Sequence, residues 1–147
     1  MKTLWDASAR QELRDRLGRL TPSANRRWGK MSAPQMVAHL VDSMRMANGE
    51  IEIPSKKLPL RFTPIKQLVI YLAPFPKSAP TAPQLITRPP ADWPSECNAL
   101  CRGMDQFAER DPSGPFPEHP AFGKLTARAW GVQVYRHIDH HLKQFGV

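Results

Sequence analysis

The sequence predicts an all-helical fold, a four-helix bundle with one long, proline-rich connection between its second and third helices. Four segments carry apolar residues at the three- and four-residue spacing of a helix, and none reads clearly as a sheet strand. Ten of the 16 prolines lie within residues 53–94, where they exclude a long regular element. A chain of 147 residues accommodates these helices as a single domain, residues 1–147.

The first two helices are predicted at about residues 8–20 and 34–48. Ser8 followed by Gln11 resembles a capping box, and so does Ser32 followed by Gln35. Gly49 is a typical residue to end the second helix. We expect these helices to bury Trp5, Ala9, Leu13, Leu17, Leu20, Met36, Val37, Leu40, Met44 and Ala47.

The last two helices are predicted at about residues 94–110 and 127–145. Thr126 is the expected N-cap of the last helix, and Gly146 is expected to end it. Their apolar positions are Leu100, Met104, Phe107, Ala108, Trp130, Val134, Ile138, Leu142 and Phe145.

The long connection is predicted to contain one shorter helix, at about residues 63–72. Thr63-Pro64 is a typical pair for the cap and first position of such a helix. Residues 73–93 are expected to be extended and irregular, because proline is so frequent there. Phe75, Leu85 and Trp93 suggest that this segment packs over the bundle.

The net charge is +8, and all of the excess lies in residues 1–77. Such a bias can attract a small anionic substrate or nucleic acid. Nucleic acid is not expected as a partner, because no zinc finger, RNA-binding signature or arginine-rich tail accompanies the charge.

No apolar run is long enough to span a membrane and no signal peptide is evident, so we expect a cytoplasmic protein without a membrane partner. Cys97 and Cys101 are then expected to be reduced.

Two histidines of the last predicted helix, His137 and His141, lie within or beside its apolar arc. Histidines at positions i and i+4 present their rings on one helix face and can bind one cation. The pair His137 and His140 is also possible, but His140 lies further out on the flank. The alternative interpretation is a pair of buried histidines whose nitrogens are hydrogen-bonded to other groups.

Three further residues are candidates for the same site. His39 lies at the edge of the apolar arc of the second helix, where it could face the last helix or bond a water molecule. Asp42, three residues later, could orient a ligand, act as a base, or form a salt bridge with Arg45 or Arg136. His119 could approach the site from its loop or serve only as a hydrogen-bonding residue there.

A second predicted helix with a single histidine, followed by a last helix with His-x-x-x-His, resembles the DinB/YfiT-like superfamily, whose members are regarded as metalloenzymes. More closely, the chain is similar to a branch known only as a domain of unknown function. The likeness spreads over most of the chain, in residues 27–32, 36–43, 75–81, 119–123 and 135–146.

The resemblance implies an up-down-down-up four-helix bundle. It also implies a divalent metal, usually zinc or nickel, held by His39, His137 and His141. Members of known activity are transferases or isomerases that use a low-molecular-weight thiol, and no reaction is assigned to the branch.

Two functions therefore stay open at this point. The first is a metal-dependent transferase or hydrolase acting on a small, anionic substrate. The second is a non-catalytic bundle that binds a metal or a partner. A homodimer is compatible with either function, although no sequence feature decides it.

Overall fold

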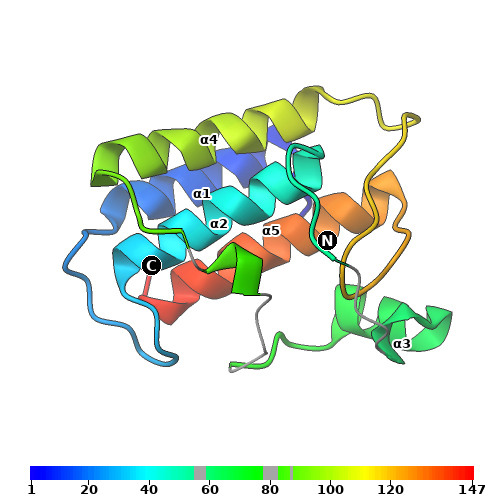
Figure 1. Cartoon of the computed structure of the whole chain (residues 1–147), viewed down its shortest axis with the longest axis horizontal. Coiled ribbons are helices and arrows are strands. Elements are labelled where there is room, and N and C mark those ends of the chain that lie inside the picture. Colours follow the sequence, from blue (N-terminus) through cyan, green and yellow to red (C-terminus); the bar gives the residue numbers. More distant parts are fainter. Residues whose placement is uncertain (55–58, 78–82, 87) are drawn as a thin grey trace.

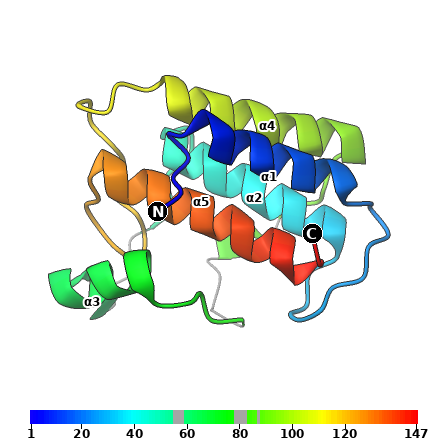
Figure 2. The same ribbon diagram turned by 180° about the vertical axis from the view of Figure 1, so that it is seen from behind.

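The computed structural model of the chain describes residues 1–54, 59–77, 83–86 and 88–147. Its four long helices are α1 (Ala7–Arg19), α2 (Ala33–Asn48), α4 (Trp93–Glu109) and α5 (Ala127–Gln144). They lie side by side, and both α4 and α5 pack against α1 as well as α2 (Figures 1 and 2). No strand occurs in the described ranges, so the prediction of an all-helical fold is confirmed.

The helix ends follow the local sequence signals in most places. Ser32 and Gln35 form the predicted capping box of α2, and Gly49 ends that helix with a left-handed φ of 81°. Thr126 caps α5 by accepting a hydrogen bond from the amide of Ala129.

Two predicted caps are wrong. Ser8 and Gln11 lie inside α1, which begins at Ala7 after Asp6. The physical reason is that Leu4 N–H donates to the carbonyl of Gly131, which fixes the N-terminal segment against α5, and the first helical hydrogen bond then runs from Arg10 N–H to the carbonyl of Asp6. Thr63 is the first residue of its helix, and Phe62 occupies the N-cap without a side-chain hydrogen bond.

The connection between α2 and α4 forms several short helical elements. They are η1 (Pro59–Arg61), α3 (Thr63–Gln67), the π-helical turn η2 (Leu68–Leu72) and η3 (Pro83–Leu85). The helix predicted for residues 63–72 is therefore present as α3 continued by η2. It lies outside the four long helices, at one end of the bundle (Figures 1 and 2).

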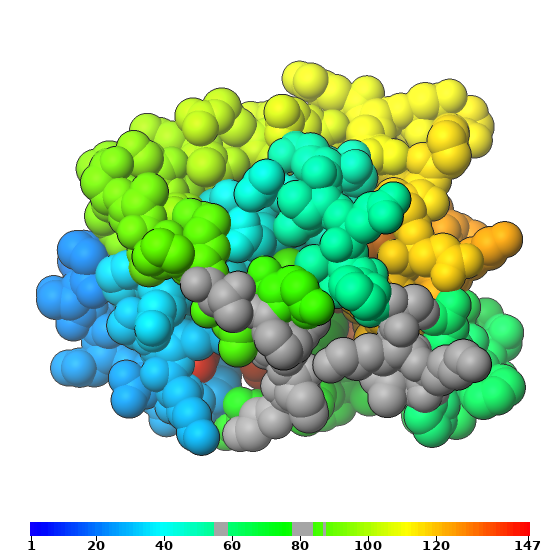
Figure 3. Space-filling view, in the orientation of Figure 1, coloured from blue at the N-terminus to red at the C-terminus, as the bar shows by residue number. Residues whose placement is uncertain are grey.

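The core between the long helices is built from the predicted apolar positions. All of them are buried except Trp5 and Ala108, which are half-buried. Leu85 of η3 is also in this core, and Trp93 packs against it. The end of the connection thus packs over the bundle as predicted, since η3 contacts α2, and the space-filling view shows it at the surface beside that helix (Figure 3).

None of the helices within the described ranges combines the length and the apolar character that crossing a bilayer requires.

Arg88 holds the end of the connection between α2 and α4. Its Nε donates to both carboxylate oxygens of Asp42 at 3.1 Å, and its Nη atoms donate to Glu96. Asp42 and Glu96 are only 4% and 3% exposed, so each carboxylate needs a charged partner to offset its lost hydration. The pairing with Arg88 lowers the pKa of Glu96. Because Arg88 follows η3 by three residues, it also fixes the place of Leu85.

We expect Arg88→Ala to lower the free energy of unfolding by about 3 kcal/mol, because it leaves the buried Glu96 without its charged partner and leaves Asp42 paired with Arg45 alone. Urea denaturation of the metal-free protein measures this change. Arg45→Ala is the matched control, since the half-exposed Arg45 also pairs with Asp42, at 3.5 Å. It should cost less than about 1 kcal/mol. Equal losses in the two variants would contradict the proposed role of Arg88.

Candidate metal centre

The structure brings together the three histidines His39, His137 and His141. His39 comes from α2, and the other two come from successive turns of α5. Each residue offers one ring nitrogen, and these nitrogens all lie within 4.8 Å of one another. The ring centroids are 5.0, 5.0 and 4.9 Å apart. These three side chains, called the histidine triad below, converge on one point from two helices.

The ring of His39 is oriented by a main-chain carbonyl. His39 Nδ1 lies 3.0 Å from the carbonyl oxygen of Leu85, which can only accept a hydrogen bond. Nδ1 therefore carries the hydrogen of the neutral ring, and Nε2 keeps its lone pair. This Nε2 lies 3.2 Å from His137 Nε2 and faces the centre of the triad.

The ring of His141 is oriented by Gln144. The side-chain NH₂ of Gln144 donates to the Trp28 carbonyl at 2.7 Å, so its Oε1 is the atom 2.9 Å from His141 Nδ1. Nδ1 must therefore donate, and Nε2 of His141 keeps its lone pair. The fit is tight, because a Cβ at Gly29 would lie 2.4 Å from Gln144 Nε2. Gly29 also has a φ of +79°, which other residues rarely adopt.

Burial keeps the triad uncharged. His39 is 3% exposed, and His137 and His141 are half-buried. Loss of hydration lowers the pKa of all three rings, and the nearby histidines lower those of His137 and His141 further. The pKa of His141 falls to about 3. At neutral pH the triad thus consists of neutral imidazoles, the form that binds metals.

One pair of nitrogens in the triad has the spacing of two ligands of a divalent cation. Two imidazole nitrogens bound to a tetrahedral zinc ion at roughly 2.0–2.1 Å are about 3.3 Å apart, and the 3.2 Å between His39 and His137 is close to this value. Three protein ligands are typical of catalytic zinc sites, which keep one or more positions for water or substrate. The half-burial of His137 and His141 indicates the side from which such a molecule could enter.

Asp42 and His140 lie beside the triad without being part of it. Asp42 makes ion pairs with Arg88 and Arg45, so it is a buried partner of two arginines and not a surface residue. The second nitrogen of His39 bonds the Leu85 carbonyl instead of Asp42. His140 packs between the rings of Trp28 and Phe75, each with its centroid 5.8 Å away. A role for Asp42 as a base stays a prediction.

His119 is a hydrogen-bonding residue of its loop. It is 8% exposed, and its Nδ1 accepts from the amides of Ala121 and Phe122 at 3.1 and 3.3 Å. Burial lowers its pKa to about 3. These contacts explain the position of His119 without a ligand. They agree with the interpretation that His119 serves only as a hydrogen-bonding residue of its loop.

Two other features have no comparable chemistry. The cysteines Cys97 and Cys101 are free and half-buried, and burial raises the pKa of Cys97 to about 11, which disfavours a reactive thiolate.

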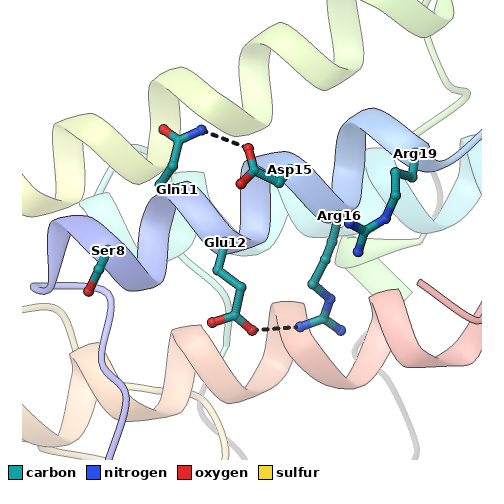
Figure 4. Close-up of a pocket in the computed structure, with 6 residues that line it drawn as sticks. All are labelled: Ser8, Gln11, Glu12, Asp15, Arg16 and Arg19. Atoms are coloured by element: carbon teal, nitrogen blue, oxygen red, sulfur yellow. Dashed lines mark hydrogen bonds and ion pairs between the residues drawn. The ribbon is translucent and has the colours of Figure 1, made fainter.

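A shallow pocket runs along α1, where Gln11 bonds Asp15 and Arg16 pairs with Glu12 (Figure 4). Polar groups that already satisfy one another leave little for a ligand.

Sequence reasoning did not identify Leu85, Gln144 or Trp28 as parts of the site. Leu85 and Trp28 contribute main-chain carbonyls, which no side-chain pattern reveals. Gln144 could have been found, because it follows His141 by three residues and so lies on the same face of α5. Residues 75–81 are one of the five segments that carry the likeness to the domain of unknown function. Of these, residues 78–81 lie outside the described residues.

The fold and the triad define an all-helical bundle protein with a cluster of three histidines between two helices. The chain belongs to the DUF1569 family, described as a protein of unknown function, whose model matches residues 5–146. The likeness to a domain of unknown function is thereby confirmed. Comparison with curated proteins and with solved structures found no match.

The buried, neutral His119 predicts an acid-sensitive fold. In the unfolded chain its ring binds a proton below about pH 6.5, whereas in the folded chain it stays neutral down to about pH 3. His119 therefore lowers stability progressively as the pH falls through this range. Between pH 7 and pH 5, metal-free His119→Gln should lose about 2 kcal/mol less unfolding free energy than the wild type. Equal losses in urea titrations would show that His119 is protonated in the folded state.

Proposed function

We propose that the protein is a divalent-metal-dependent enzyme of the DinB-like type, with zinc or nickel held by His39, His137 and His141. The observation that carries this proposal is the convergence of three imidazole nitrogens from α2 and α5 within 4.8 Å. The four long helices, with the long connection between α2 and α4, are compatible with the up-down-down-up bundle of that superfamily.

The orientation of the rings supports metal binding beyond mere proximity. His39 and His141 each donate Nδ1–H to a fixed acceptor, which leaves both Nε2 lone pairs available. Metal-binding histidines are typically oriented by such a hydrogen bond from the second ring nitrogen. A pair of histidines that only satisfied each other would not require these two acceptors.

The chemistry that a zinc or nickel ion would supply is activation of a bound water or thiol, because a divalent cation stabilises the anion formed when a proton leaves. The chain contributes three neutral ligands and therefore leaves the full charge of the ion for this purpose. Leu85 and Gln144 orient two of the rings, and the core around α2 excludes water from His39. We propose transferase or hydrolase activity, with a low-molecular-weight thiol as a possible co-substrate.

The first test is metal content in the tag-free protein, purified without chelator and measured by mass spectrometry. We expect about one equivalent of zinc or nickel in the wild type and loss of it in His39→Ala, because two histidines bind such an ion much more weakly than three. His140→Ala is the matched control and should retain the metal, since His140 lies on the same helix outside the triad. Full occupancy in His39→Ala would refute the assignment of this ligand.

The orienting role of Gln144 gives a second test. Gln144→Leu removes the acceptor of His141 Nδ1–H while leaving all three ligands in place, so metal affinity should fall about 10- to 100-fold. Competition with a chromophoric chelator measures this affinity. Gln133→Leu, another buried glutamine of α5, controls for the loss of a buried amide. Equal affinities in the two variants would exclude a specific role for Gln144.

A metal-binding role without catalysis is the other outcome of these experiments. If the metal is retained but no turnover appears with thiols and electrophilic or hydrolysable substrates, the bundle serves to bind the metal or a partner.

A further inference from the structure

Aromatic rings from two distant loops flank the half-buried side of the histidine triad. Trp28, between α1 and α2, lies 5.8 Å from the ring of His140. Phe75, after η2, lies 5.8 Å from His140 and 6.3 Å from His137. Both loops are fixed to α5, since Gln144 bonds the Trp28 carbonyl and Arg136 donates to the carbonyls of Val69, Ile70 and Ala73. The rings of Trp28, His140 and Phe75 contact one another and form one aromatic surface beside the triad, against which a flat apolar molecule can lie.

The charge at this rim is positive. The Nζ of Lys77 lies 5.0 Å from the centre of the Trp28 ring, and no carboxylate of the described residues pairs with it. The one acidic residue of α5, Asp139, is engaged by Arg16 and Lys143. Because Lys77 is exposed and its side chain is flexible, its ammonium group can turn from the indole face to an anion.

A second polar group at the rim lacks a partner. The indole Nε1 of Trp28 is buried, and no atom accepts a hydrogen bond from it. A buried donor without an acceptor costs about 1–3 kcal/mol, so such groups are rare in folded proteins and indicate a missing water, ion or ligand. The same side chain thus combines an unused donor with a neighbouring cation.

We propose that Trp28, Lys77 and Phe75 form a binding subsite for a small organic anion with a flat apolar body, such as an aromatic carboxylate. Lys77 and the indole N–H of Trp28 bind the charged end, while the body lies against the rings of Phe75 and His140. The opposite end of the molecule then points toward the triad. This inference rests on the proposed function only where it concerns the end of the molecule that points toward the triad. The binding of the charged end needs no metal, because Lys77 and Trp28 supply the donors.

The test measures benzoate binding to the full chain by isothermal titration calorimetry, in metal-free and in zinc-loaded protein. Benzamide, which has the same shape but no charge, is the comparison ligand. We expect benzoate to bind about tenfold more tightly than benzamide. Lys77→Gln and Trp28→Phe should each weaken benzoate about five- to tenfold, because each removes one donor and keeps the neighbouring contacts. Lys77→Arg should retain binding.

Lys143→Gln is the matched control, since it removes an exposed lysine of α5 that pairs with Asp139. Benzoate binding that is equal to benzamide binding, or that falls equally in Lys77→Gln and Lys143→Gln, would overturn the subsite. The metal-free arm separates the two proposals. If the protein does not bind zinc but binds benzoate in a manner that depends on Lys77, the subsite is supported and the metal centre is refuted. If it binds zinc but not benzoate, the metal centre is supported and the subsite is refuted.

Discussion

Arg88 makes the interaction on which the arrangement of the candidate site depends. Its guanidinium bridges Asp42 of α2 and Glu96 of α4, two carboxylates that are almost fully buried. The arginine offsets the hydration that both carboxylates lose on burial, and it comes from the connection, not from a helix. Closing the bundle therefore also fixes the connection, and with it the Leu85 carbonyl that orients His39. Stability and site geometry are set by the same ion pairs.

The histidine triad, unlike the two carboxylates that pair with Arg88, consists of buried groups that stay uncharged. Three imidazoles within 5.0 Å of one another repel when protonated, and burial disfavours the charged form of each ring. The fold accommodates them as neutral rings with lowered pKa values, and it supplies acceptors for the outward-facing nitrogens of His39 and His141. The electron pairs that remain on these two rings face inward. The cation binding that we propose and an acid-sensitive core would therefore follow from the same arrangement.

The sequence alone predicts the helices and much of the site. Apolar spacing locates all four long helices within about one residue, and the helical face of α5 separates His141 from His140 because that distinction depends on angle alone. The case for His39 was weaker, since its position opposite α5 depends on how two helices pack. Arg45 is one of the predicted salt-bridge partners of Asp42, whereas Arg88 could not be predicted because it is 46 residues away along the chain. Cap assignments failed where a tertiary contact, Leu4 with Gly131, moved a helix start.

The orienting groups of the triad explain why its surroundings are hard to recognise in a sequence. The Leu85 carbonyl orients His39 directly, and the Trp28 carbonyl fixes the amide of Gln144. A main-chain carbonyl survives almost any substitution of its own residue, so the identity of residue 85 or 28 imposes little on the hydrogen bond. What matters is the position of the backbone, which depends on Arg88 in one case and on Gly29 in the other. The ring orientations are therefore specified by two residues that do not contact a ring of the triad, Arg88 and Gly29, together with Gln144, which does.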